Sequence, residues 1–126
     1  DEVSKMFNVA ISLHCPDPVR VDDSLKAVNL YYIAREAVHN AIRHGGATGV
    51  HVVLERRNNS ICLSVRDNGR ASVSPGTGAG LSIMRKRAEM IGGRLTVRQA
   101  GNGRGIEVTC VVYERGRNGC RKKSRR

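Results

Sequence analysis

The chain has 126 residues, of which 40% are hydrophobic, 26% charged and 3% aromatic. This length is enough for one domain with a buried core and too short for two, and no run approaches the roughly 18 apolar residues that a membrane span needs. The formal net charge is +11, but seven of the 22 basic residues and none of the 11 acidic ones fall within 115–126. The rest of the chain therefore carries only +4, which predicts one domain over 1–114 and a basic, disordered tail over 115–126.

The charge distribution and the cysteines also limit which partners and metal sites we expect. Nucleic-acid-binding modules interleave aromatic residues with basic ones, and the tail contains no aromatic residue, so we expect no nucleic-acid contact. Besides nucleic acid, the tail could contact an anionic lipid or an acidic partner, but we favour a merely solubilising end. The N-terminus lacks the pattern of a signal peptide, which favours a cytoplasmic protein or fragment. The cysteines are scattered without metal-ligand spacing, so we expect buried free thiols: Cys15, Cys62, Cys110 and Cys120.

In chain order, alternation of apolar residues predicts a strand over 7–13. After a proline-marked loop, Asp22 or Asp23 is a candidate N-cap for a helix over about 24–44, which the glycine pair at 45–46 ends. The apolar residues of this helix recur at helical spacing and predict one buried stripe: Leu30, Ile33, Ala34, Ala37, Val38, Ala41 and Ile42.

The second half of the chain predicts two β-hairpins separated by a polar loop and a helix. The first hairpin joins 49–56 to 60–66, the helix covers about 80–91, and the second hairpin joins 94–99 to 105–113. Strands that come in hairpins predict a mixed, largely antiparallel sheet, and two helices can cover one face of it. We therefore expect an α+β fold, a two-layer α/β sandwich. The buried side of the second helix is expected to hold Leu81, Met84, Ala88 and Ile91.

The first helix carries four polar residues on one side, next to the buried stripe. Glu36, Asn40, Arg43 and His44 stand at i, i+4, i+7 and i+8. Asn is a poor helix former, but its side-chain oxygen is a neutral ligand suited to Mg²⁺. Arg43 and His44, one turn further on, could then meet phosphate groups. The alternative is a solvated polar face with an accidental Asn.

A second candidate is the Asp-Asn-Gly motif at 67–69, directly after a predicted strand. Taken alone it is most often a turn, because Asn and Gly tolerate positive φ. A functional Asp67 would sit at the strand end and accept a hydrogen bond in a pocket, for which an exocyclic amine such as that of adenine is a suitable donor.

A third candidate is the glycine-rich stretch with glycines at 76, 78 and 80, immediately before the second predicted helix. Such glycines let the backbone approach a ligand closely, and a helix N-terminus offers N–H groups to phosphate. The stretch is not a P-loop, because no Gly-Lys-Ser/Thr follows, and it is not the dinucleotide fingerprint, because Leu81 stands where the third glycine is required. A flexible loop at the helix entry is the alternative.

Together, in this order, the three motifs resemble the N, G1 and G2 boxes of the GHKL (Bergerat-fold) ATPases, which share the histidine-kinase-type ATPase fold. The stretches "YYIAREAVHNAIRHGGATGVHVVL", "LSVRDNG" and "GTGAGLSIMRKRAEMIGGRLTV" look like the catalytic domain of a sensor histidine kinase. "EAVHNAIRH" and "GLSIMRKRAEMIGG" are closest to the subgroup paired with response regulators of the LuxR/NarL type. The resemblance covers about residues 7–113.

The resemblance implies bound ATP and Mg²⁺, with the metal ligated by Asn40. It places Arg43 toward the phosphates and His44 toward the phosphate or ribose. Glu36 matches the acid that polarises water in the hydrolysing relatives, and in a kinase we expect it to orient the Mg²⁺ shell.

For the base and the lid, the resemblance implies that Asp67 accepts a hydrogen bond from the adenine amine while Gly69 gives the base room. Gly78, Gly80 and Leu81 would form the phosphate side of the lid and the start of its helix. Two residues depart from the family pattern. Ala71 stands where a second glycine usually follows, and Ile106 follows Gly105 where relatives often carry Thr.

None of the histidines shows the phosphoacceptor pattern of the family. We therefore expect the ATP-binding part of a longer kinase, which does not autophosphorylate alone and is cytoplasmic or the cytoplasmic part of a membrane-bound sensor. Its partners would be a dimerisation domain carrying the phosphoacceptor and a LuxR/NarL-type regulator, with no membrane contact by this domain. The alternatives are a related GHKL ATPase, an anti-sigma-type serine kinase, and a degenerate non-catalytic nucleotide-binding module.

Overall fold

The structure is a computed structural model that describes residues 10–15, 23–70, 79–100 and 104–114. Every predicted helix and strand is confirmed, and the bounds that fall within the described residues shift by one residue at most. The predicted strand 7–13 is described from residue 10 onward. The elements in chain order are β1 (Ala10–His14), α2 (Ser24–Arg43), β2 (Gly49–Arg57), β3 (Ser60–Asp67), α3 (Ala79–Met90), β4 (Gly93–Gln99) and β5 (Ile106–Tyr113).

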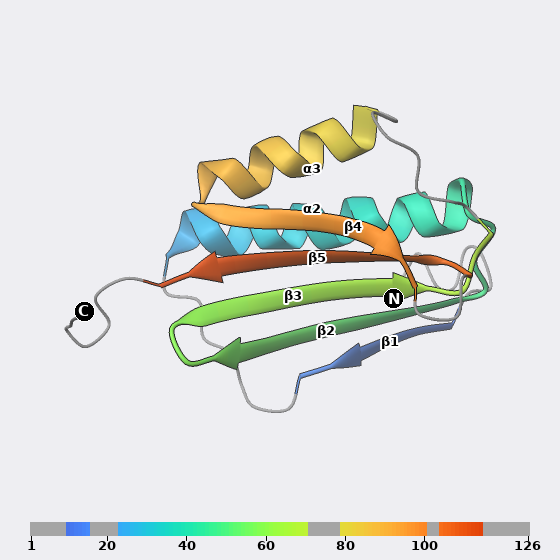
Figure 1. The fold of residues 1–126 in the computed structure, drawn as a ribbon, viewed down its shortest axis with the longest axis horizontal. Coiled ribbons are helices and arrows are strands. Elements are labelled where there is room, and N and C mark those ends of the chain that lie inside the picture. Colours follow the sequence, from blue (N-terminus) through green and yellow to red (C-terminus); the bar gives the residue numbers. More distant parts are fainter. Residues whose placement is uncertain (1–9, 16–22, 71–78, 101–103, 115–126) are drawn as a thin grey trace.

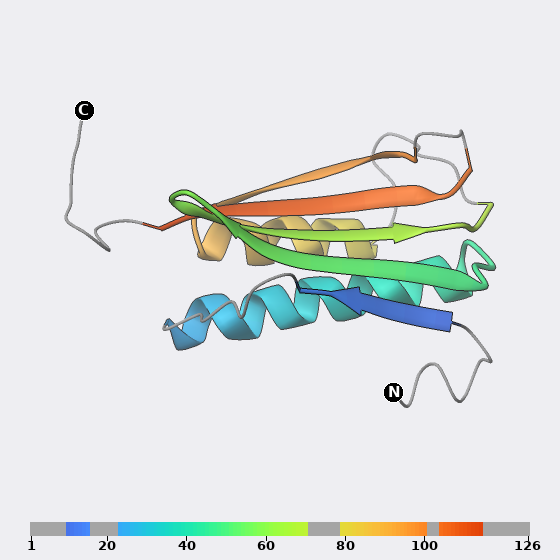
Figure 2. The ribbon, with the colours of Figure 1, turned by 90° about the horizontal axis from the view of Figure 1, so that it is seen from below.

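The strands form one five-stranded sheet in the order β1-β2-β3-β5-β4. β1 pairs with β2 in parallel, because α2 carries the chain back between them. The other three pairings, β2 with β3, β3 with β5 and β4 with β5, are antiparallel. Figures 1 and 2 show both helices on one face of the sheet. The mixed, two-layer α+β sandwich predicted from the sequence is therefore confirmed.

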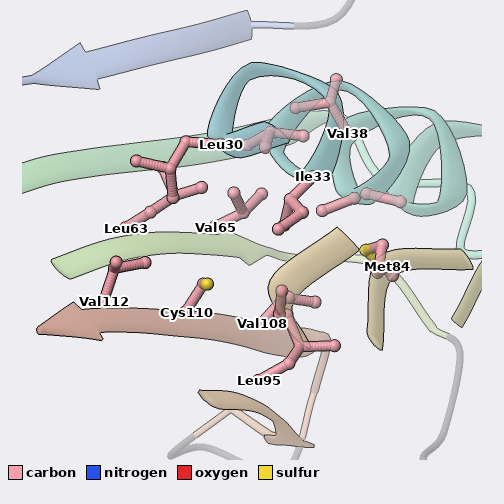
Figure 3. Close-up of a cluster of buried hydrophobic side chains, with 14 of the residues drawn as sticks. Leu30, Ile33, Val38, Leu63, Val65, Met84, Leu95, Val108, Cys110 and Val112 are labelled. Carbon is pink, nitrogen blue, oxygen red and sulfur yellow. The ribbon is translucent and has the colours of Figure 1, made fainter. Parts of the chain in front are cut away.

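The core lies between the helices and the covered face of the sheet (Figure 3). The predicted helical stripes are confirmed, except that Ala34, Ile42 and Leu81 are only partly buried against that core. The largest fully buried apolar side chains come from both layers: Ile33 of α2, Met84 of α3, Ile61 of β3, and Cys110 and Val112 of β5.

The caps explain where α2 begins and ends. Asp23 is its N-cap, and Asp23 Oδ1 accepts hydrogen bonds from the Leu25 and Lys26 amides at 2.9 and 3.3 Å. At the other end Gly46 has φ of +63°, a left-handed conformation that favours glycine. Neither described helix combines the length and apolar character that crossing a bilayer requires.

The molecule has two distinct ends. α2 and β3 finish, and α3 and β5 begin, at the end that we call the Asp67 end (right in Figure 1). The opposite end, which we call the Tyr113 end, holds the β2–β3 turn, the end of α3 and the last residue of β5. The last turn of α2, the Asp67 motif and the start of α3, which the glycine-rich stretch precedes, therefore lie at the Asp67 end.

The cysteines correct one expectation from the sequence. Cys110 is buried, but Cys62 is only half-buried and Cys15 is exposed, so they are not a uniform set of buried thiols. Burial, with a smaller contribution from the neighbouring Cys62 thiol, raises the pKa of Cys110 to about 11. Cys120 and the basic tail lie outside the described residues.

Candidate functional site

The half-buried carboxylate of Asp67 stands at the C-terminal end of β3. Asp67 Oδ1 accepts hydrogen bonds from the Gly69 amide at 2.7 Å and from the Ile106 amide of β5 at 3.3 Å. Within the described ranges, Oδ2 has no hydrogen-bond partner. One oxygen is thus used to orient the side chain, and the other is left to accept from a ligand N–H.

Two glycines bring three segments into backbone contact around Asp67. A Cβ added to Gly69 would lie 2.6 Å from the Gly45 carbonyl oxygen, and that oxygen accepts the Arg70 amide at 2.7 Å. Gly105 has φ of +84°, and a Cβ there would lie 2.0 Å from the Asp67 carbonyl oxygen. The end of α2, the loop after β3 and the start of β5 can meet only because these positions carry no side chain.

Asn68 has a role that the sequence did not reveal. Its Oδ1 accepts the amides of Thr48 and Gly49, both at 3.0 Å, and its Nδ2 donates to Thr48 Oγ1 at 3.2 Å. Neither Asn68 nor Gly69 adopts a positive φ. The positive-φ reason for predicting a turn at this motif is therefore wrong. Instead, the Asn68 side chain bonds the loop to the start of β2, and the missing side chain of Gly69 leaves room for the Gly45 backbone.

The four polar residues of α2 approach the same end. Glu36 and Asn40 are half-buried, whereas Arg43 and His44 are exposed. The predicted helix end at 44 shifts by one residue, because His44 is the C-cap and its amide donates to the Asn40 carbonyl at 2.9 Å. In the part of the chain that the structure describes, none of the four side chains has a hydrogen bond or ion pair. They are polar groups that the fold itself does not use.

The glycine-rich stretch leads into a helix, as predicted, since α3 begins at Ala79. Gly80 lies in its first turn and Leu81 packs partly buried against the core. Gly76 and Gly78, like Ala71, fall outside the described residues. The amide groups that open α3 therefore lie at the Asp67 end (Figure 1), where they can act on an anion.

A groove of about 560 Å³ also opens at the Asp67 end. β1, β2 and the end of β3 line it, with Asp67, Asn68, His51 and Arg66 among its residues. None of the four polar residues of α2 lines it. The structure thus brings Asp67 and Gly69 to the end of α2 through backbone contacts. The groove shares Asp67 with this arrangement, but its other walls come mainly from β1, β2 and the residues Ala100 and Arg104.

A second cluster, at the Tyr113 end, was also missed in the sequence. Asn29 of α2 is 1% exposed. Its Nδ2 donates to the Leu25 carbonyl at 2.9 Å, and its Oδ1 accepts from Arg87 Nη1 of α3 at 3.1 Å. The Arg87 guanidinium carbon lies 4.4 Å from the ring centroid of Tyr32. The sequence did hold one signal for this cluster: Asn29 stands four positions before Ile33, so a polar residue interrupts the apolar stripe of α2.

Several sensor proteins are similar to this chain in sequence. The chain is 35% identical over 111 residues to the nitrate/nitrite sensor protein NarX of Escherichia coli K12, covering 86% of this chain and 18% of NarX. It is 34% identical to NarQ of the same organism, covering 82% of this chain and 19% of NarQ. With the oxygen sensor histidine kinase NreB of Staphylococcus carnosus, identity is 30%, covering 88% of this chain and 33% of NreB. The chain thus spans a third or less of each of these relatives.

Solved structures agree on the fold. The ATP-binding domain of PrrB from Mycobacterium tuberculosis superposes with a TM-score of 0.72 at 21% identity, covering 91% of this chain and 88% of that one. The Acinetobacter baumannii histidine kinase AdeS gives a TM-score of 0.72 at 16% identity, covering 91% and 59%. The sequence profile of one family matches residues 26–115. The chain belongs to that family, the histidine kinase-, DNA gyrase B- and HSP90-like ATPases, and is homologous to NarX, NarQ and other sensor histidine kinases.

Proposed function

We propose that this chain is the Mg-ATP-binding catalytic domain of a two-component sensor histidine kinase. It would donate the γ-phosphate to a histidine on a dimerisation domain of the same kinase, in the cytoplasm. The observation that carries the proposal is the Asp67 carboxylate, which two backbone amides orient in a loop that is bonded to the residue after α2, Gly45.

Base recognition rests on Asp67. Its Oδ2 would accept a hydrogen bond from the 6-amino group of adenine. The family pattern often has Thr where this chain has Ile106, so the hydroxyl of that Thr is missing here. The Ile106 main-chain amide nevertheless donates to Asp67 Oδ1 at 3.3 Å, so the substitution leaves the carboxylate anchored to β5. This contact supports adenine recognition in spite of the departure from the family pattern.

The triphosphate would lie between the end of α2 and the start of α3. Arg43 and His44 are exposed and without protein partners in the described part of the chain, so both can meet phosphate oxygens. The amides that open α3 at Ala79, with Gly80 and Leu81, would face the same charge, and Gly78 would belong to the lid that precedes them.

The donor set on α2 fits a magnesium ion that arrives with the nucleotide. Asn40 offers a half-buried amide oxygen with no partner among the described residues, and one turn earlier Glu36 offers a carboxylate in the same condition. A neutral oxygen ligand is compatible with phosphate oxygens that already carry the negative charge. When bound, Mg²⁺ would neutralise charge on the β- and γ-phosphates. Asn40 would ligate the metal, and Glu36 would orient its water shell.

Phosphoryl transfer requires positioning more than covalent chemistry by the protein. The contribution of this chain would be to hold the base at Asp67 and the phosphates at the helix ends, while the acceptor histidine comes from the dimerisation domain. Homology to NarX and NarQ supports a response regulator of the LuxR/NarL type as the next recipient of the phosphoryl group.

The test is a calorimetric titration of ATP, with and without Mg²⁺, into the wild type, Asp67→Asn and Asn40→Ala. We expect Asp67→Asn to lose about 10- to 100-fold in affinity, because it removes a charged acceptor of the base. Asn40→Ala should lose chiefly the dependence on Mg²⁺.

The matched control is Asn59→Ala, which makes the same amide-to-methyl change on an exposed residue at the Tyr113 end. It should bind ATP like the wild type. A wild type that unfolds in a normal cooperative transition but binds no nucleotide would show that the domain is a degenerate, non-catalytic member of its family.

A further inference from the structure

The loop after β3 is anchored on three sides. Asp67 Oδ1 holds it to β5 through the Ile106 amide, and the Arg70 amide holds it to the end of α2 at Gly45. The third anchor is the Asn68 side chain, whose Oδ1 accepts the consecutive amides of Thr48 and Gly49, just before and at the start of β2, at 3.0 Å each. Of these three anchors, this is the one made by a side chain that the proposed function does not use.

We propose that Asn68 is a positioning residue that sets the Asp67 carboxylate for reading the 6-amino group of a purine. This inference rests on the proposed function. Asp67 Oδ1 accepts the amide of the residue two positions later, Gly69, at 2.7 Å. A bond of this kind forms only when the intervening residue turns the chain back. Asn68 is that residue, and its amide group fixes the turn against β2.

The start of β2 is shaped to receive this amide group. A Cβ added to Gly49 would lie 3.2 Å from Asn68 Nδ2, closer than ordinary packing, so glycine leaves room for the contact. Thr48 contributes its amide to Oδ1 and its hydroxyl to Nδ2. The Asn68 main-chain amide also donates to the Gly49 carbonyl at 3.2 Å, which no side-chain substitution removes. Variants of Asn68 should therefore loosen the turn without detaching the strand.

The experiment compares ATP with purine riboside triphosphate, which carries hydrogen in place of the 6-amino group. Dissociation constants for both are measured by calorimetry in the wild type, Asn68→Ala and Asn68→Asp. We expect the wild type to prefer ATP by about 10-fold or more, because the contact is a hydrogen bond to a charged group. In Asn68→Ala the preference should fall below about 3-fold, through weaker ATP binding alone.

Asn68→Asp should restore the preference. Its carboxylate can accept the same two amides, and the Thr48 hydroxyl can turn to donate to it. The control for lost stability is Asn58→Ala at the Tyr113 end, where φ of +52° disfavours Ala. That variant should melt at a lower temperature and keep the wild-type preference for ATP.

If Asn68→Ala does not fold, Gly49→Ala provides a milder form of the same test, since its methyl group would displace the Asn68 amide. If these variants kept the wild-type preference for ATP over purine riboside triphosphate, or if they bound both nucleotides more weakly by the same factor, the inference would be overturned. Equal binding of both nucleotides by the wild type would also overturn it, while triphosphate binding would stand. A wild type that binds neither nucleotide would remove the proposed function, and this inference with it.

Discussion

The two ends of the sheet are held together by different kinds of contact. At the Asp67 end the contacts around Asp67 involve backbone atoms, as in the Arg70 amide to Gly45 and the Ile106 amide to Asp67. Side-chain pairs at this end include Asn68 with Thr48 and, between β4 and β5, Arg98 with Glu107. At the Tyr113 end, side chains contact one another. Asn29 accepts from Arg87, Arg87 lies over Tyr32, and Arg56 pairs with Glu114.

This difference bears on function. A polar side chain that already has a protein partner gains little from a ligand, because the ligand must replace that partner. At the Asp67 end the backbone holds the segments together, so Glu36, Asn40, Arg43 and His44 keep their polar groups without partners in the described part of the chain. At the Tyr113 end the side chains stabilise the fold. Together with the proposed function, the comparison predicts that residues for binding and residues for stability lie at different ends, and the predictions below test that separation.

The largest effect is expected from Gly105→Ala, compared with Gly92→Ala. Both glycines have positive φ, +84° and +69°, so both substitutions strain the backbone. Only at Gly105 does the new Cβ collide, 2.0 Å from the Asp67 carbonyl oxygen, whereas nothing lies within 4 Å at Gly92. We expect Gly105→Ala to lower the free energy of unfolding by at least about 3 kcal/mol and Gly92→Ala by about 1 kcal/mol.

Urea denaturation measures both losses, and ATP titration of the folded fraction accompanies it. Gly92→Ala should bind ATP like the wild type, whereas Gly105→Ala should bind it more weakly. Equal losses of stability in the two variants would show that positive φ alone matters and that the close approach at Asp67 is not required.

The next effect concerns the core between the two ends. The pKa of Cys110 is raised from its ordinary value of 9.0 to about 11, mainly by burial. Below pH 9 the thiol is protonated in both the folded and unfolded states. Between pH 9 and 11 only the unfolded state loses the proton, so the free energy of unfolding should fall by about 2 to 3 kcal/mol.

Denaturation curves from pH 8 to 11, for the wild type and Cys110→Ala, isolate this contribution from lysines and tyrosines that also titrate. The stability difference between the two proteins should narrow as the pH rises. If the core joins both ends in one cooperative unit, probes at Tyr32 and at the proposed nucleotide site should report a single transition. A constant difference across the range would contradict the raised pKa.

The sequence predicted the fold well because its signals are periodic. The stripe along α2 and the alternation in the strands depend only on residue type and spacing, so the layers and most element bounds were recoverable. The contact between the Asp67 loop and the end of α2 could not be predicted, because it depends on the close approach of Gly69 to the Gly45 carbonyl in space. Asn68 and Asn29 were missed for a related reason. Asn68 bonds to Thr48 and Gly49, and Asn29 bonds to Leu25 and Arg87, so most of their partners are distant in sequence. Neither residue breaks the periodic pattern of apolar residues strongly enough to be noticed in the sequence.

A smaller effect is expected from Asn29→Ala, which removes the acceptor for Arg87 and the donor to Leu25. Because Asn29 is 1% exposed, water does not readily replace these bonds. We expect a loss of about 2 kcal/mol in unfolding free energy and no change in ATP affinity. Asn59→Ala, on the surface, should change stability by less than about 0.5 kcal/mol. A change in ATP affinity beyond threefold would mean that the helix contact belongs to the site, and the separation of the two ends would fail.

The smallest effect is expected from Glu114→Gln, which removes the ion pair with Arg56. The Glu114 side chain is 11% exposed and that of Arg56 26%, so solvent screens this pair less than Arg98 with Glu107, where Arg98 is 75% exposed. We expect a loss of about 1 kcal/mol for Glu114→Gln and about 0.3 kcal/mol for Arg98→Gln, both smaller at high salt. The Glu114 amide still donates to the Asn59 carbonyl at 2.6 Å in either variant, which keeps the end of β5 in place. ATP affinity should be unchanged in both. If Glu114→Gln weakened ATP binding, charge at the Tyr113 end would influence the nucleotide at a distance, and stability and binding would not be divided between the two ends.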